Sequence, residues 1–403
     1  AALGVLVLCF LMNALARGMG ETFAVFLLPI GHETGWERGT LTSIYSIFMA
    51  VNGLSSPFVG MMFDRLGPRA LYICGLSSMG LGYAFASHAT ELWQLYICLG
   101  VMTGFGVASV GMIPASALVA RWFDRNLATA MAVVSAGLGT GTLALAPLSQ
   151  VLIDGQGWRD GYLWLGGAVL VLVLPVAVLP WTAIRKGRIE RRYGLGMPEA
   201  PVLGSAIRSR AFWALFFVFF VTAVGVFAIS LQSVAYLVEQ GMPPIEAASA
   251  FGFTGMLSIV GMLVTGTAAD RFGNRITATL SYMCTLIGIG ALFLIQAHLS
   301  FLFVAVFVLF FGLSMGARGP IVATVSATLF SGRGLGTIYG TITTGQGLGA
   351  AVGSWLAGFL HDATGGYDVG FLVSSGFILI GITLFWTVPE LKARRTPSTE
   401  TSS

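Results

Sequence analysis

Three charged side chains lie deep inside long apolar stretches of this chain. Arg17 and Glu21 fall in the stretch of about 3–28, and Arg318 falls in the stretch of about 299–329. If these stretches cross a bilayer, each arginine costs at least about 2.5–3.5 kcal/mol near the centre. An arginine offers paired donors that match a carboxylate. We therefore expect Arg17 and Arg318 to bind an anionic solute. The alternative for Arg17 is an ion pair inside the protein.

Glu21 follows Arg17 by four residues, which places both side chains on one face of a helix. Removal from water favours the protonated form of a carboxyl group, while a neighbouring guanidinium favours the charged form. A solute that competes for Arg17 would shift this balance. We expect Glu21 to bind a proton that moves with the solute, and exchange of anions without protons is the alternative.

Polar residues in neighbouring apolar stretches are further candidates for contact with the solute. Each of them can instead form a hydrogen bond between two helices, which is a common role for polar residues in membranes. The candidates are Asn13, Tyr45, Ser233, Tyr236, Tyr339 and Gln346. The four histidines are scattered and the four cysteines form no CxxC pair, so the sequence predicts no metal site.

The elements that position these residues follow from the composition. Of the 403 residues, 56% are hydrophobic and 9% are charged, whereas a soluble domain carries about 25% charged residues. A helix needs about 20 apolar residues to cross a bilayer. The sequence then predicts twelve spans, at about 3–28, 40–62, 70–88, 92–117, 126–153, 161–183, 211–238, 246–268, 276–296, 299–329, 335–360 and 368–388.

The tenth span contains the run Arg318-Gly319-Pro320. Proline lacks an N–H donor and clashes with the preceding helical turn, so the run predicts a break. An unwound segment would expose carbonyl groups to a central cavity, and a kink for packing is the equal alternative.

The basic residues predict the orientation in the membrane. Seventeen of the 21 lysines and arginines fall in alternate loops, in the segment 184–210 or in the tail, whereas only Arg38 and Arg159 fall in the other loops. Basic loops face the cytoplasm. We therefore expect both termini in the cytoplasm. A role of the 184–210 arginines in lipid binding is the alternative to a topology signal.

The two halves of the chain repeat one another. Gly60-Met-Met-Phe-Asp-Arg-Leu-Gly67-Pro-Arg69 follows the second span, and Gly266-Thr-Ala-Ala-Asp-Arg-Phe-Gly273-Asn-Arg275 follows the eighth, 206 residues later. Gly157-Trp-Arg-Asp-Gly161 likewise corresponds to Gly366-Tyr-Asp-Val-Gly370. Such duplication is typical of transporters whose halves move around a site at the membrane midplane.

These loops resemble the signature of the major facilitator superfamily. The stretch Phe23–Pro29 with Gly35-Trp36-Glu37-Arg38, and the stretch Ala132–Gly141, are similar to its monocarboxylate porter and oxalate–formate exchanger branch. Members of that branch usually carry an arginine in the eighth helix, but 251–269 has no basic residue here. Glu21 stands where animal members carry a lysine.

The resemblance implies a cytoplasmic gate, in which aspartates of the signature loops accept hydrogen bonds from arginines or from a helix end. A role in topology alone is the alternative. The implied gating residues are Gly60, Asp64, Arg65, Gly67, Arg69, Arg121, Arg125, Gly266, Asp270, Arg271, Gly273, Arg275 and Arg333.

Together these features predict an all-α membrane protein with twelve transmembrane helices in two pseudo-symmetric six-helix bundles. We expect bundles at 1–183 and 211–390, a cytoplasmic linker at 184–210 and a cytoplasmic tail at 391–403. The predicted function is secondary transport of a mono- or dicarboxylate by alternating access, coupled to H+ or a counter-anion. An exporter of drugs or hydrophobic compounds is the alternative, and a net positive cavity argues against it.

We expect the protein to lie in the inner, cytoplasmic membrane with the lipid bilayer as its partner. The sequence shows no nucleophile–base pair, so no enzyme activity is predicted, and no cofactor is implied. The net charge of +4 does not form a basic face, so no nucleic-acid partner is predicted.

Overall fold

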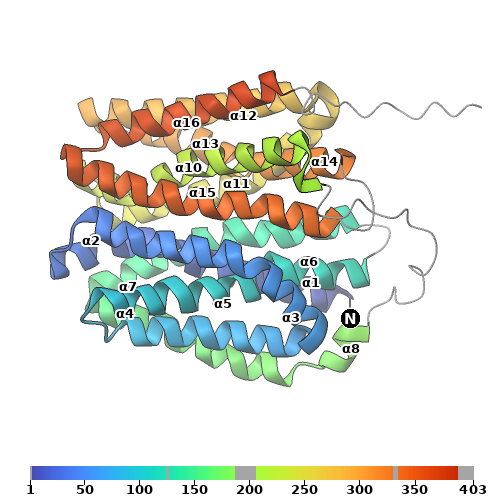
Figure 1. The fold of residues 1–403 in the computed structure, drawn as a ribbon. Helices are drawn as coiled ribbons and strands as arrows, with labels where there is room; N and C mark the ends of the chain where they lie inside the picture. Colours follow the sequence, from blue (N-terminus) through green and yellow to red (C-terminus); the bar gives the residue numbers. More distant parts are fainter. Residues whose placement is uncertain (1, 124–126, 187–205, 330–334, 389–403) are drawn as a thin grey trace, which may run out of the picture.

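The computed structural model describes residues 2–123, 127–186, 206–329 and 335–388. Every regular element in these ranges is a helix, and the helices form two bundles that lie one above the other in Figure 1. This confirms the predicted fold class. Part of the predicted linker (187–205) and the predicted tail (391–403) lie outside the described residues.

The N-terminal half contains the predicted spans one to six. Its helices are α1 (Ala2–Glu21), α2 (Phe23–Thr34), α3 (Arg38–Ala86), α4 (Leu92–Leu95), the π-helix η1 (Tyr96–Met102), α5 (Thr103–Val110), α6 (Met112–Trp122), α7 (Leu127–Val178) and α8 (Trp181–Lys186). The second and third spans are continuous in α3, and the fifth and sixth are continuous in α7.

The C-terminal half contains spans seven to twelve. Its helices are α10 (Arg210–Glu239), α11 (Pro244–Phe272), α12 (Asn274–Ala297), α13 (Phe301–Met315), α14 (Arg318–Leu329), α15 (Leu335–Thr364) and α16 (Asp368–Thr387). Across the described parts of both halves, eight helical stretches are long and apolar enough to cross a membrane.

The repeat seen in the sequence recurs in the backbone of the two halves. Gly67 turns α3 with a φ of 80°, and Gly273 makes the corresponding turn between α11 and α12 with a φ of 88°. Side chains with a Cβ rarely adopt this conformation, so both turns need glycine. The signature loops therefore have the same backbone course in both halves.

The fourth and tenth spans are interrupted at corresponding places. In the fourth span α5 ends at Val110 and α6 begins at Met112, and in the tenth α13 ends at Met315 and α14 begins at Arg318. The break predicted around Arg318 thus lies directly before it, and Arg318 is the first residue of α14.

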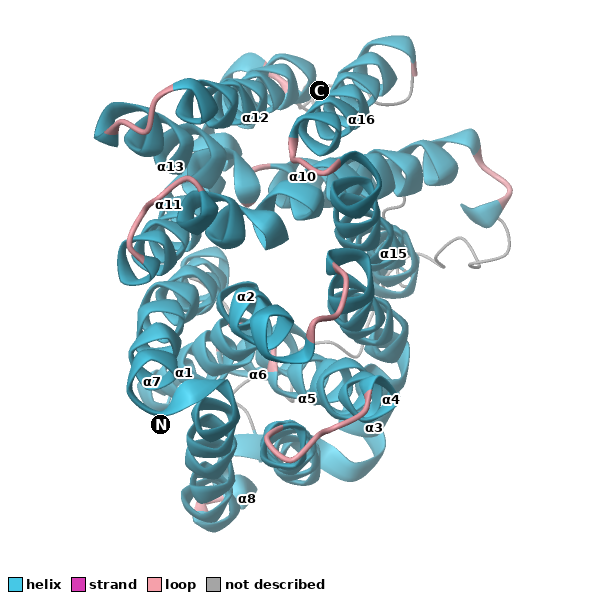
Figure 2. Cartoon of the chain, turned by 90° about the vertical axis from the view of Figure 1, so that its left-hand side faces the viewer, coloured by secondary structure: helices cyan, strands magenta, loops and turns pink. Residues whose placement is uncertain are grey.

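The halves touch most extensively along two pairs of helices, and α2 also packs against α10. α3 packs along α15, and α7 packs along α11, as the end-on view in Figure 2 also shows. A Cβ on Gly53 would lie 3.2 Å from the Cα of Gly347, and a Cβ on Gly139 would lie 2.2 Å from the carbonyl oxygen of Gly255. Glycine permits such close helix contacts in membranes.

Two ends of the molecule are used as reference points below. The end that carries the N-terminus and α8 is called the terminal end (right in Figure 1). The opposite end, where α2 is followed by α3, is called the far end.

Candidate functional site

The first span is broken beside its buried acid. α1 ends at Glu21 and α2 begins at Phe23. At the break, the hydroxyl of Thr22 donates a hydrogen bond to the carbonyl oxygen of Met19 over 2.7 Å, and the hydroxyl of Tyr83 donates to the same oxygen over 2.5 Å. The same oxygen accepts the backbone N–H of Thr22 over 3.2 Å, and Thr22 keeps helical backbone angles, so the irregularity is local and its polar groups are satisfied.

Arg17, Glu21 and Tyr45 form one contact group, which we call the Arg17 cluster. Arg17 forms an ion pair with Glu21 over 2.7 Å, and the hydroxyl of Tyr45 donates to the second carboxylate oxygen over 3.1 Å. Glu21 is only 3% exposed, whereas the side chain of Arg17 is 30% exposed. The ion pair that the sequence analysis gave as the alternative for Arg17 is therefore present, with its cation at the accessible side.

The Arg17 cluster lies against the other half of the protein. The guanidinium of Arg17 is 5.9 Å from the ring centre of Phe227, which belongs to α10. A cation over an aromatic face is attracted to the ring electrons. Counting by the repeat offset of 206, Phe227 corresponds to Glu21, so the C-terminal half carries an aromatic ring where the N-terminal half carries the acid.

A small cavity borders the cluster within the N-terminal half. Its volume is about 10 Å³, and its lining includes Gly20, Phe23, Tyr45, Phe48, Tyr83 and Thr103. Such a volume holds about one water molecule. It is too small for an organic acid.

Arg318 is held inside the C-terminal half and is 3% exposed. One of its terminal nitrogens donates to the carbonyl of Ser281 over 3.1 Å and to the hydroxyl of Thr285, and the guanidinium lies 4.6 Å from the ring centre of Tyr282. These partners all belong to α12. Among the described residues, Nε and Nη1 of Arg318 have no hydrogen-bond partner. The structure therefore does not bring Arg318 into contact with Arg17.

The weaker polar candidates are dispersed. Asn13 lies between α1, α6 and α7, where its amide nitrogen contacts the sulfur of Met112 over 3.2 Å and donates to the carbonyl of Val134 over 3.3 Å. Ser233 donates to the carbonyl of Ser230, one turn earlier in its own helix. Both are buried, and their contacts are those of helix packing.

Three further candidates complete the predicted binding set. Tyr236 donates to the carbonyl of Leu292 over 2.6 Å and is buried inside the C-terminal half. Gln346 is exposed on α15. The side chain of Tyr339 lies outside the described part of the structure.

The described parts of the two signature loops, at the turn of α3 and between α11 and α12, are at the terminal end. A Cβ on Gly60 or on Gly266 would meet nothing within 4 Å, so these corresponding positions both have open space beside them. Arg65, Arg69 and Arg271 are exposed. The side chains of Asp64, Asp270 and Arg121 lie outside the described part of the structure, as do residues Arg125 and Arg333.

Arg275 is a gating candidate whose described partners lie on another helix. It donates to the carbonyl oxygens of Phe385 over 2.8 Å and Trp386 over 2.6 Å, at the end of α16, and lies over the Trp386 ring. A cation at a helix C-terminus is favoured by the exposed carbonyls. Arg275 therefore fixes the signature loop to its own half.

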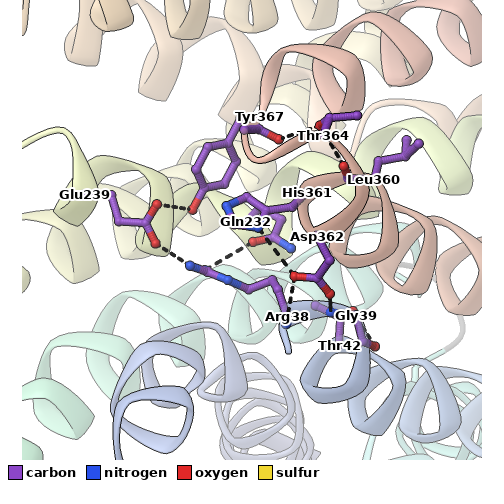
Figure 3. A network of polar contacts seen from close by, with 11 residues as sticks. Arg38, Gly39, Thr42, Gln232, Glu239, Leu360, His361, Asp362, Thr364 and Tyr367 are labelled. Atoms are coloured by element: carbon purple, nitrogen blue, oxygen red, sulfur yellow. Dashed lines mark hydrogen bonds and ion pairs between the residues drawn. The ribbon is translucent and has the colours of Figure 1, made fainter. Parts of the chain in front are cut away.

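Sequence reasoning missed a polar network at the far end (Figure 3). Arg38 of α3 forms an ion pair with Glu239 at the end of α10. The backbone N–H groups of Arg38, over 3.0 Å, and of Gly39 donate to the carboxylate of Asp362 on α15. Tyr367 donates to Glu239 over 2.9 Å. Every one of these carboxylate contacts to Arg38 and Gly39 joins the two halves.

The sequence held a partial signal for this network. Arg38 was one of the two basic residues in the sparsely charged loops, and Glu239 and Asp362 are acidic residues at helix ends on the same side. Which acid meets which cation depends on how the two bundles pack, and spacing along the chain does not give that. Burial raises the pKa of Tyr367, so its hydroxyl remains a donor to Glu239.

Comparisons with known proteins agree with this architecture. The family model described as Major Facilitator Superfamily matches residues 6–317 and 269–402. Monocarboxylate transporter 13 of Rattus norvegicus is 28% identical over 383 residues, covering 94% of this chain and 87% of the relative. Monocarboxylate transporter 3 of Rattus norvegicus is 27% identical, covering 93% of this chain and 77% of the relative.

Among solved structures, the chain is similar to a bacterial homologue of the human lysosomal transporter Spinster in an inward-facing and occupied conformation. The TM-score is 0.76 with 14% sequence identity, and the match covers 97% of this chain and 98% of that chain. At this identity the likeness shows the fold alone.

Proposed function

Because this chain belongs to the Major Facilitator Superfamily, we propose that it transports a small organic anion, a mono- or dicarboxylate, by alternating access. Its relatives in the monocarboxylate transporter branch carry names that indicate carboxylate substrates. The chain is a multi-pass membrane protein whose described helices form two bundles. Two bundles that move against each other expose a site between them to each side in turn.

The observation that carries the proposal is the position of Arg17. Its guanidinium is partly accessible, lies where the two halves meet, and contacts Phe227 across that boundary. A carboxylate loses much solvation free energy on leaving water and needs a cation at its binding site. Arg17 is more accessible than Arg318, which is 3% exposed, and the apolar ring of Phe227 suits the hydrocarbon part of an organic acid.

Proton coupling is proposed to proceed through Glu21. In the structure Arg17 is already paired with Glu21, so an incoming carboxylate competes with Glu21 for the same guanidinium. A proton on Glu21 removes this competition and leaves Tyr45 as a hydrogen-bond partner of the neutral acid. Substrate and proton binding then favour each other. Without such a proton step, the same site would exchange one anion for another.

Arg318 is retained as a second substrate contact. Two of its nitrogens have no partner among the described residues, so the guanidinium keeps donors for an anion. Its bonds to α12 would have to rearrange for it to face the Arg17 cluster. A two-cation site would suit a dicarboxylate, whereas Arg17 alone suits a monocarboxylate. Variants at the two positions distinguish these cases.

The terminal end is proposed to face the cytoplasm from the inner membrane, because the two signature loops lie there and carry the exposed Arg65, Arg69 and Arg271. The signature loops with Gly67 and Gly273 would then form the cytoplasmic gate. Surface contacts of this kind contribute about 1 kcal/mol or less each, which allows repeated opening and closing.

A ligand screen tests the substrate class. Purified protein is heated in the presence of mono- and dicarboxylates, and the acid that raises the unfolding temperature most is then tested for uptake into proteoliposomes. Arg17→Gln is expected to abolish both effects. Arg318→Gln is expected to reduce them for a dicarboxylate, and Arg208→Gln, which alters an exposed arginine outside the site, serves as control. Full stabilisation of both variants by the best acid contradicts the proposal.

A second measurement tests the coupling. Uptake of the same acid is driven by an imposed pH gradient in wild type and in Glu21→Gln. Loss of pH-driven accumulation with retained exchange of labelled for unlabelled acid supports the role of Glu21. Unchanged accumulation in Glu21→Gln rejects it.

A further inference from the structure

Corresponding carboxylates of the two halves have different partners at the far end. Glu33 ends the first span and Glu239 ends the seventh, with the repeat offset of 206. Glu33 accepts a hydrogen bond from Trp158 over 2.6 Å and pairs with Arg159 over 2.9 Å, both in the N-terminal half. Arg159 also donates to two carbonyl groups after α3. Glu33 is therefore neutralised within its own half.

Glu239 has the aromatic partner but not the cation of that arrangement. In the repeat of Gly157–Gly161 with Gly366–Gly370, Tyr367 corresponds to Trp158. Tyr367 donates a hydrogen bond to Glu239 as Trp158 donates one to Glu33. The position of Arg159 is taken by Asp368, which cannot neutralise a carboxylate. The cation for Glu239 comes instead from Arg38, in the other half. The missing charge of one half is thus supplied by its neighbour.

Asp362 forms a second polar contact between the two halves. The first backbone N–H groups of a helix have no partner inside the helix, and a side chain usually satisfies them from the preceding residue. The N-cap residue of α3 is Glu37, whose side chain makes no such bond. The N–H groups of Arg38 and Gly39 are capped by Asp362 of the other half. Negative charge is also favoured at this helix end by the helix dipole.

We infer that Arg38, Glu239, Asp362 and Tyr367 form a latch that closes the far end, and that its cation acts across the two halves because Asp368 replaces the arginine present in the N-terminal repeat. Separation of the halves leaves Arg38 without its acid, Glu239 without its cation and the start of α3 without its cap. This goes beyond the proposed transport function, which supplies only the assignment of the far end to the outer face.

The latch is suited to reversible opening. The side chains of Arg38 and Glu239 are 12% and 36% exposed, so water replaces each partner readily when the pair separates. Two glycines bring the backbones close enough for the contacts. A Cβ on Gly39 would lie 2.9 Å from the carboxylate of Asp362, and a Cβ on Gly358 would lie 2.8 Å from the carbonyl oxygen of Arg38.

The test measures the width of the far end in purified protein without substrate. Spin labels are attached to Glu37→Cys and Ala363→Cys, two exposed positions on opposite halves, after replacement of the four native cysteines by alanine. Wild type is expected to give a short distance. Arg38→Gln and Glu239→Gln are each expected to raise the ratio of long to short distances about fivefold. The charge exchange Arg38→Glu with Glu239→Arg is expected to restore the short distance.

Asp368→Arg tests the cross-half origin of the cation while every latch residue stays in place. The new arginine stands where Arg159 stands in the N-terminal repeat and competes with Arg38 for Glu239, so the long distance is expected to grow. Asp368→Asn is the control and should match wild type.

Unchanged distances in both Arg38→Gln and Glu239→Gln would overturn the latch. A response of those two variants with none for Asp368→Arg would overturn the explanation by the repeat. Because no substrate is used, failure of organic-anion transport leaves the distances unaffected and counts against the proposed function alone.

Discussion

The first helix of the N-terminal half is broken at Thr22 and carries the Arg17–Glu21 pair, whereas its counterpart α10 runs unbroken from Arg210 to Glu239. With the repeat offset of 206, Ala223 and Phe227 stand where the pair would be. The turns at Gly67 and Gly273, by contrast, are the same in both halves. Features that must move together are duplicated, while the charges that would meet an asymmetric solute occur once.

The far end adds a second kind of difference. Glu33 and Glu239 are duplicated, but only Glu33 finds its cation in its own half. The C-terminal repeat has Asp368 where the N-terminal repeat has Arg159, and Arg38 of the other half pairs with Glu239. Loss of symmetry at one position can therefore create a device for conformational change as well as a binding site.

The largest effect is expected from removing the cation of the Arg17–Glu21 pair, which occurs in the N-terminal half alone. Arg17→Gln leaves Glu21 buried with only the Tyr45 hydroxyl as partner. Removing one member of a buried ion pair costs about 3–5 kcal/mol, and the partial exposure of Arg17 reduces this to about 2–3 kcal/mol. The variant should therefore unfold at a lower temperature, as measured by tryptophan fluorescence in detergent.

The double variant Arg17→Gln with Glu21→Gln is the control for that measurement. Two neutral amides leave no buried charge, so most of the lost stability should return while uptake of the organic acid stays absent. Phe227→Leu changes the corresponding position in the other half, and a similar-sized apolar replacement should cost less than about 1.5 kcal/mol. A double variant no more stable than Arg17→Gln would show that the pair is not the source of the loss.

Prediction from sequence succeeded where a local rule decides the outcome. Apolar length predicts the spans, and the i, i+4 spacing predicts that Arg17 and Glu21 share one helix face, where they form the ion pair given as the alternative. The run Arg318-Gly319-Pro320 predicts the interruption that the structure has directly before Arg318. It did not reveal that the bonds of Arg318 run to α12, or that Phe227 faces Arg17. These contacts depend on the rotation of each helix about its axis within the bundle. A buried charge in the sequence does not show which neighbouring helix its side chain faces.

A smaller effect is expected from a substitution at the far end that changes no charge. In Gly358→Ala the new Cβ would lie 2.1 Å from the hydroxyl of Thr42 and 2.8 Å from the carbonyl oxygen of Arg38. The hydroxyl can rotate away, but the carbonyl belongs to the backbone, so the start of α3 must shift. Overpacking of this kind costs about 1–3 kcal/mol, and here the closed far end bears that cost.

Distances between labels at Glu37→Cys and Ala363→Cys are expected to lengthen in Gly358→Ala. Gly370→Ala is the matched control in the same half, since a Cβ there would meet nothing within 4 Å. It also carries the same gain in helix propensity, about 1 kcal/mol, so propensity alone does not explain a difference between the two variants. Equal distances in both variants would show that the close contact at Gly358 does not hold the far end.

The smallest expected effect concerns the hydroxyl of Tyr367, whose pKa is raised by burial, with Arg38 opposing and Glu239 adding to the shift. In the open form this hydroxyl should have an ordinary pKa of about 10. A group with the higher pKa in the closed form stabilises that form fully at lower pH and loses this effect as pH rises. The closed population of wild type should therefore be constant below about pH 9 and fall above about pH 10.

Tyr367→Phe lacks the hydrogen bond to Glu239. It should therefore open slightly more at neutral pH, by about 1 kcal/mol or less, and should not show the decline at high pH. The same label pair measures both, and a decline that persists in Tyr367→Phe would assign the titration to another group.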